Sequence, residues 1–380
     1  MKDKSLIYLG AVIALYSLSS SIIGIFLPTY YLELGLSINQ IIILVACMIA
    51  MLGVVPFFIL RFLPKYFERM VSVGVISTIL FYVCLIYVKN PLVIGIVYGI
   101  AMAAFWPPFN LLVLRLSNIK RRGLIVSLVY IVIPGLIGVF GPALGGTIIQ
   151  FFGFNCVFLL SILVLIAAFF FSFGIKVKPV TSGIMIPKQK LMFIFAAIVI
   201  IGAISGASSW IAYPLFLHTL SEDFLQMGFV ATAISLVCII IAFIAGKVSE
   251  VHKRRLNFAV FGALMASAWL IAMSFVRTIP QLIGISIFIG LANAFWIALF
   301  SMYGDFFKRK YHATLVVLWE FLLMIGRLAG LVPVYVFINQ FDFGSYYWIL
   351  GLISLIIIIP YAILQYLHYK GKIKIDSKQI

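Results

Sequence analysis

Two ionisable side chains, Glu320 and Arg327, lie within one long apolar segment near residues 313–338. They are seven positions apart, so on a helix they share a face and are separated by about 10 Å along the axis. A carboxyl group in apolar surroundings can take up a proton, and a guanidinium group can hold that carboxylate or an anionic ligand. We therefore interpret Glu320 as a candidate for proton coupling and Arg327 as its charge partner or an anion site. The alternative is a structural pair that holds the helix in register.

Other polar and aromatic side chains recur within four further apolar segments, where they could line a binding cavity. Trp106 and Asn110 are one helical turn apart, and Pro107 and Pro108 lie between them. Prolines free backbone carbonyls of a membrane helix, and only a cavity or a partner can satisfy these carbonyls. For the serines the alternative is close helix packing. The candidate cavity-lining residues are Ser17, Ser21, Trp106, Asn110, Ser209, Tyr213, Asn293 and Trp296.

Other kinds of site chemistry have no support in the sequence. The four cysteines lie within apolar segments without metal-ligand spacing, and the four histidines lie at segment ends without forming a cluster. The ten acidic residues are scattered, and no phosphate-binding loop of the GxxxxGK[ST] type occurs. We therefore expect no metal, no cofactor and no enzymatic activity.

The composition excludes a water-soluble protein. Of the 380 residues, 65% are hydrophobic and 10% are charged, whereas soluble domains carry about 25% charged residues. The net charge of +17 could suggest nucleic-acid binding, but the basic residues gather in alternate connections between apolar segments. This is the positive-inside pattern of a membrane protein. It predicts a multi-pass protein of the cell membrane with both termini in the cytoplasm, in contact with lipid and not with nucleic acid.

Apolar segments long enough to cross a bilayer recur along the whole chain. They predict an all-α integral membrane protein with about twelve transmembrane helices. The predicted spans are residues 6–28, 40–60, 70–88, 92–114, 124–149, 155–175, 191–217, 226–247, 256–276, 280–303, 313–338 and 346–368.

The second half of the sequence repeats the first. Pro28 lies 186 positions before Pro214, and Arg69 lies 186 positions before Arg255. We expect the two prolines to close the first and seventh spans. Because each half has an even number of spans, the halves are predicted to be parallel repeats. The predicted organisation is an N-terminal six-helix bundle (1–175), a basic cytoplasmic linker (176–190), a C-terminal six-helix bundle (191–369) and a cytoplasmic tail (370–380).

Two short motifs resemble those of a known family. The connection between the eighth and ninth spans reads Gly246-Lys-Val-Ser-Glu250-Val-His-Lys-Arg254-Arg255 and resembles the loop G-x-x-x-D-x-x-G-R-K/R of the major facilitator superfamily. Glutamate replaces the aspartate, and lysine replaces the second glycine. The resemblance implies a gating loop of Gly246, Glu250, Arg254 and Arg255. The matching connection of the first half lacks the glycines and the acid of the motif.

The fifth span contains Gly141-Pro142-Ala-Leu-Gly145-Gly146, which resembles the core of the antiporter signature of the same superfamily. These glycines let a neighbouring helix approach closely, and the proline bends the span. Ordinary helix packing is the alternative interpretation.

The resemblance implies two six-helix bundles around a central cavity that opens to one side of the membrane at a time. It implies a monomeric secondary transporter of a small-molecule substrate, with export favoured over uptake. Because no ATP-binding loop occurs, we expect coupling to an ion gradient or simple facilitation, and Glu320 makes the proton the expected coupling ion. Uptake of an organic anion or a sugar is the alternative within the same fold. A non-transporting membrane sensor or a lipid scramblase is the alternative of another class, because fold alone does not determine function.

Overall fold

The computed structural model describes residues 2–117, 125–126, 128–176, 184–185, 190–252, 255–306 and 309–370. These residues form helices and short connections, without a strand among them. The helices of the first half are α1 (Lys2–Ile23), α2 (Leu27–Glu33), α3 (Ile38–Phe62), α4 (Met70–Tyr87), α5 (Pro91–Leu116), α7 (Ile133–Gly138), α8 (Gly141–Phe152) and α9 (Phe154–Ser172). Those of the second half are α10 (Lys190–Ile204), α11 (Ala212–Leu220), α12 (Phe224–His252), α13 (Arg255–Met273), α14 (Ile279–Phe306), α15 (His312–Phe337), α16 (Phe343–Leu355) and α17 (Ile358–Tyr369).

Within the described residues, ten helical segments are long and apolar enough to cross a membrane. Two shorter apolar helices, Ala259–Met273 and Ile279–Ala292, occupy the places of the ninth and tenth spans. The twelve segments follow in the predicted order, so the prediction of an all-α membrane fold with about twelve spans is confirmed.

The prediction that Pro28 and Pro214 close their spans is wrong. Pro28 lies in the first turn of α2, after a 3₁₀ turn at Gly24–Phe26, and the span continues to Glu33. Pro214 likewise lies in the first turn of α11, and that span continues to Leu220. A proline fits the first helical turn because its missing N–H would have no partner there. Each proline therefore restarts a helix after a break in the span.

The fifth span is also built from several pieces. It begins with a π-helical turn at Leu128–Val132, continues as α7, and restarts as α8 with Pro142 in the first turn. The segment is therefore irregular at two places, and one of them coincides with the glycine-proline motif.

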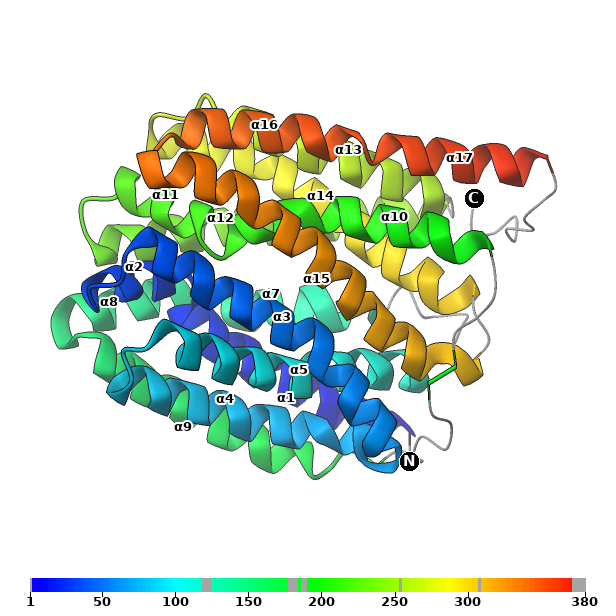
Figure 1. Cartoon of the computed structure of the whole chain (residues 1–380), viewed down its shortest axis with the longest axis horizontal. Coiled ribbons are helices and arrows are strands. Elements are labelled where there is room, and N and C mark those ends of the chain that lie inside the picture. Colours follow the sequence, from blue (N-terminus) through cyan, green and yellow to red (C-terminus); the bar gives the residue numbers. More distant parts are fainter. Residues whose placement is uncertain are drawn as a thin grey trace.

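Helices that start at the end of the molecule opposite the two termini have side-chain caps (Figure 1). Ser37 and Gln40 form a reciprocal capping box at α3, and Asn90 accepts hydrogen bonds at the start of α5. Asp342 accepts a hydrogen bond from the backbone N–H of Ser345 at the start of α16, and hydrogen bonding to Ser345 lowers the pKa of Asp342. These caps satisfy backbone N–H groups that have no partner within the helix.

The helices run side by side along the long axis, and both chain ends lie at one end of the molecule (Figure 1). We call this the termini end and the opposite one the far end. In the first half α1 packs against α9, and α5 packs against α3 and α4. In the second half α13 packs against α14 and α16, and α10 packs against α15. The halves meet where α8 packs against α12 and where α3 packs against α15.

An ion pair joins two elements near the termini end of the first half. The carboxylate of Glu68, in the 3₁₀ turn Pro64–Arg69, pairs with the guanidinium group of Arg115 at the end of α5. The second-to-third connection therefore has a charged contact, although it lacks the glycines and the acid of the loop motif.

Candidate functional site

The two ionisable residues of α15 form a buried pair. Only 4% of Glu320 is exposed, and its Oε2 lies 3.8 Å from Nη1 of Arg327. A buried carboxylate needs an opposite charge or hydrogen-bond donors to offset its lost hydration. The Arg327 guanidinium group supplies the opposite charge.

Glu320 also contacts the first half of the chain. Nδ2 of Asn110, on α5, donates a hydrogen bond of 3.2 Å to Oε1 of Glu320. The hydroxyl of Tyr130 donates in turn to Oδ1 of Asn110. We call Tyr130, Asn110, Glu320 and Arg327 the charge network. It crosses from the fourth and fifth spans to the eleventh, so it joins the two halves of the protein.

Tyr130 is the member of this network that the sequence analysis missed. It lies in the π-helical turn of the fifth span, which is a type of helix irregularity that is frequent at functional sites. Its hydroxyl within an apolar segment is the one signal that could have identified it.

The Arg327 guanidinium group also contacts the seventh span. Its Cζ lies 4.8 Å from the ring centroid of Trp210, in cation–π geometry. A Cβ built on Gly206 would lie 3.6 Å from Cγ of Arg327. Arg327 therefore contacts both an acid and an aromatic ring.

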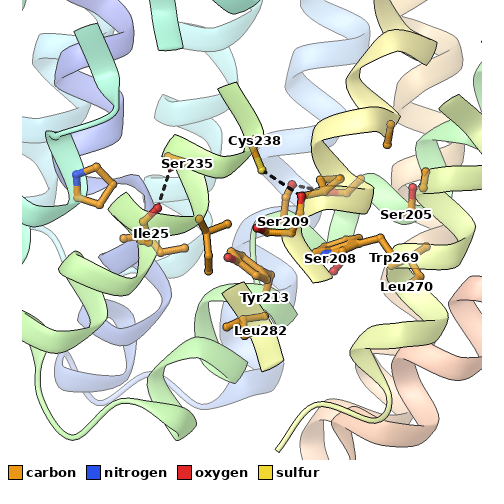
Figure 2. A pocket seen from close by; sticks show the side chains of 18 of the residues that line it. Ile25, Ser205, Ser208, Ser209, Tyr213, Ser235, Cys238, Trp269, Leu270 and Leu282 are labelled. Atoms are coloured by element: carbon orange, nitrogen blue, oxygen red, sulfur yellow. Dashed lines mark hydrogen bonds between the residues drawn. The ribbon is translucent and has the colours of Figure 1, made fainter. Parts of the chain in front are cut away.

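A cavity of about 500 Å³ lies beside this part of the seventh span, lined by residues of the first, fifth, seventh, eighth, ninth and tenth spans. Figure 2 shows its polar side chains, of which Ser209 and Tyr213 come from the seventh span and Ser235 and Cys238 come from α12. The candidate residues Ser21, Ser209 and Tyr213 line this cavity.

A second cavity of about 450 Å³ is lined by the candidate residues Ser17 and Ser21 and by Tyr130. Ser21, Ser235 and Cys238 line both cavities, so the two adjoin. Tyr130 connects the charge network to the second cavity, and Gly206 lies between Arg327 and the first cavity.

Trp106 and Asn110 do not lie on the wall of either of these two cavities. The Trp106 ring packs edge-on against Tyr16 and Phe105, at centroid distances of 5.9 and 5.3 Å. Asn110 is 5% exposed and belongs to the charge network. The two side chains are one turn apart on α5, yet each has a different set of partners.

The remaining candidates lie partly outside the described residues. Asn293 and Trp296 belong to α14, and the structure does not describe their side chains. Of the predicted gating loop, Gly246 and Glu250 belong to α12 and Arg255 begins α13, again without described side chains; Arg254 lies outside the described residues. Most of the linker at 176–190 and the tail after residue 370 also lie outside them.

The glycine-proline motif of α8 contacts two neighbouring helices. A Cβ at Gly141 would overlap the Ser21 hydroxyl, and one at Gly145 would overlap the carbonyl oxygen of Ile22 in α1. Gly146 faces the other way, where a Cβ would overlap the carbonyl oxygen of Phe224 at the start of α12. The small residues of the motif thus lie at close contacts with the first and eighth spans.

Among the described residues, no group of three or more histidine, cysteine, aspartate or glutamate side chains could hold a metal ion.

The sequence model of the Major Facilitator Superfamily matches this chain twice, at residues 9–191 and at residues 192–377. Among solved structures, that of the human organic anion transporter MFSD10 (TETRAN) is similar, with a TM-score of 0.72 over 95% of this chain and 99% of that chain. The two sequences are 12% identical, so the likeness concerns the fold. No curated protein sequence matches this chain significantly. Since the family model covers both halves, the chain belongs to the major facilitator superfamily, whose members are membrane transporters and not enzymes.

Proposed function

We propose that this protein is a proton-coupled secondary transporter of a small organic molecule, with Glu320 as the residue that carries the proton. The observation that supports this most directly is the hydrogen bond between Asn110 and Glu320, because it makes a buried acid part of the contact between the two halves. Alternating access requires the halves to move relative to each other. A contact whose strength depends on a proton can couple that movement to a proton gradient.

The two protonation states of Glu320 differ in what they can hold. The ionised carboxylate attracts Arg327 through Oε2, and its Oε1 accepts a hydrogen bond from Nδ2 of Asn110. The neutral acid loses the attraction to Arg327, and its amide contact becomes weaker because the acceptor is no longer charged. Protonation therefore loosens the link between α5 and α15 and frees the guanidinium group to stay with Trp210.

In this proposal the protein lies in the cell membrane. The charges of its loops place both termini and the linker in the cytoplasm. Export in exchange for protons is the proposed direction, supported by the glycine-proline motif of α8. The protein acts as a monomer in this proposal.

The proposal is tested with purified protein in liposomes. A panel of sugars, organic anions, amino acids and cationic drugs is screened for compounds that raise the melting temperature, and the flux of each stabilising compound is measured with and without a pH gradient. Antiport with protons predicts accumulation in vesicles with an acidic interior. Symport would give accumulation in vesicles with an acidic exterior, which would support uptake.

Glu320→Gln is expected to abolish accumulation against a gradient while leaving ligand binding and exchange measurable. Glu222→Gln, in the exposed connection before α12, is the matched control and should behave like the parent protein. Undiminished gradient-driven flux in Glu320→Gln would contradict the coupling role. Ligand binding without flux in any gradient would indicate a sensor, and transfer of labelled lipid between leaflets of the same liposomes would indicate a scramblase.

A further inference from the structure

The larger cavity lacks charge. None of its described lining residues is ionised: its polar groups are serine hydroxyls, the Tyr213 hydroxyl, the Trp269 indole and the Cys238 thiol. Arg327 is not among the lining residues, and its guanidinium group already faces Glu320 and Trp210. An ionic ligand would lose its hydration in this cavity without gaining a partner of opposite charge. The cavity therefore disfavours both anions and cations.

The serine hydroxyls of the cavity wall present acceptor oxygens. Five of the six lining serines point the proton at a backbone carbonyl three or four residues earlier in the same span, and the sixth, Ser208, makes no such bond. The five bonds are Ser21 to Leu18 at 2.9 Å, Ser205 to Gly202 at 3.1 Å, Ser209 to Gly206 at 2.7 Å, Ser235 to Ala231 at 2.8 Å and Ser286 to Ile283 at 2.6 Å. Because the proton is used within the helix, the lone pairs of each oxygen can accept from a ligand. Such a wall suits a molecule with several O–H or N–H groups.

Two aromatic rings supply an apolar surface in the same cavity. The rings of Tyr213 and Trp269 lie 6.0 Å apart between centroids, tilted by 56°. Trp269 also packs edge-on against Tyr347, which is buried, at 6.4 Å. This second contact holds the indole in place, so a ligand ring meets a preformed surface. A volume of about 500 Å³ lies within the range of cavities that hold drug-sized molecules.

We infer that this cavity binds an uncharged amphipathic molecule with one aromatic ring and several hydroxyl or N–H groups, of the kind represented by an aryl glycoside. The inference rests on the proposed function, since it assigns the transported molecule to this cavity. The 3₁₀ turn Ser205–Ser209 links the cavity to the charge network. Ser205 and Ser209 line the cavity, while Gly206 also approaches Arg327. A neutral ligand can therefore act on the charge network through this turn.

The test compares two probes that differ in one group. 4-Nitrophenyl β-glucoside is neutral. 4-Nitrophenyl β-glucuronide has a carboxylate where the glucoside has a CH₂OH group. Binding to the purified parent protein is measured by titration calorimetry at one pH and without a membrane gradient. We expect the glucoside to bind at least tenfold more tightly. Equal or tighter binding of the glucuronide, or no binding of either probe, would overturn the inference.

Variants of the cavity wall provide the second arm. Trp269→Ala should weaken glucoside binding about tenfold or more, whereas Trp269→Phe, which keeps an aromatic ring, should recover most of the affinity. Trp348→Ala is the matched control, because Trp348 is 41% exposed and packs against Phe275 on the outer surface. Glucoside affinity that is unchanged in Trp269→Ala would overturn the assignment to this cavity.

The proposed function and this inference can fail separately. Glu320→Gln should still bind the glucoside more tightly than the glucuronide, because the measurement uses no gradient and Glu320 does not line the cavity. Loss of gradient-driven flux with the glucoside preference intact supports both proposals. A preference for the glucuronide that disappears in Arg327→Ala would show that Arg327 is an anion site and would overturn the inference alone.

Discussion

The two halves of this transporter meet at two contacts of opposite character. At the contact of α8 with α12, backbone lies against backbone. Gly146 faces Gly228, and a Cβ built on Gly146 would lie 3.1 Å from Cα of Gly228. At the contact of α15 with α3 and α5, side chains meet. The rings of Phe321 and Phe57 lie 5.5 Å apart between centroids, and Glu320 accepts a hydrogen bond from the Asn110 amide.

The first contact also uses a backbone group that the break before α8 leaves without a helical partner. The N–H of Ala143 belongs to the first turn of α8 and donates to the hydroxyl of Thr232, on α12, at 3.0 Å. A helix start normally needs such an outside acceptor. Thr232, in the eighth span of the chain, supplies this acceptor, so the contact between Gly146 and Gly228 also includes a hydrogen bond.

The difference teaches which contact can change during transport. Backbone atoms at van der Waals distance cannot rearrange without separating the helices, so the contact of α8 with α12 is suited to a pivot. The side chains of Phe321 and Glu320 can change rotamer or protonation state, so the contact of α15 with α3 and α5 is suited to opening and closing.

The largest effect is expected for Gly146→Val. The new side chain would overlap the backbone of Phe224, which cannot move aside, so the folded protein should lose about 1–3 kcal/mol or more. The melting temperature of the purified variant should fall accordingly. Gly284→Val is the control, because Gly284 is exposed on α14 and a Cβ there meets nothing within 4 Å. Equal melting temperatures would remove the idea of a fixed pivot.

A smaller effect is expected for Gly53→Ala at the contact of α3 with α15. The added methyl group would overlap Sδ and Cβ of Met324; the thioether can turn away, but Cβ moves only with the backbone, so the loss should be about 1–2 kcal/mol. Met324→Ala in the same protein should relieve the part of the overlap that involves Sδ, and a double-mutant cycle on melting temperature measures this relief. Additive losses in the cycle would show that this contact is as rigid as the glycine contact.

Tyr130→Phe removes the donor to Asn110 and should cost about 0.5–1.5 kcal/mol. Because Asn110 is then held by one partner fewer, we also expect weaker accumulation of substrate against a gradient in liposomes. Tyr87→Phe, at an exposed position, removes the same hydroxyl elsewhere and should leave accumulation intact. Parent-like accumulation in Tyr130→Phe would exclude Tyr130 from coupling.

The smallest effect is expected for Asn339→Ala. Nδ2 of Asn339 donates to Oδ1 of Asn39 at 2.8 Å, which links the halves at the far end, but the bond is exposed. Water can replace an exposed hydrogen bond, so the melting temperature should change by the equivalent of less than about 0.5 kcal/mol. A loss as large as that of Gly146→Val would show that polar side chains at the far end, and not the glycines, hold the halves together.

Sequence reasoning could select Glu320 and Arg327 on α15, because an ionisable group in an apolar segment is visible in the sequence itself. It could not find the link to Tyr130, since 20 positions separate that residue from Asn110 and 210 positions separate Asn110 from Glu320. It placed Pro28 and Pro214 at the ends of spans because a proline is compatible with the end of one helix and with the first turn of the next. Only the backbone on either side distinguishes these cases.

The membrane class, the number and order of the spans, and the two charges within the eleventh span can be read from the amino-acid sequence alone. These follow from hydropathy, because the bilayer demands long apolar helices and makes every buried charge conspicuous. The tertiary structure decided that Asn110 contacts Glu320 while Trp106 packs on Tyr16, and that Ser21, Ser209 and Tyr213 share one cavity. Such partnerships depend on how each helix is rotated and tilted against its neighbours, and apolar segments with similar hydropathy carry little information about either.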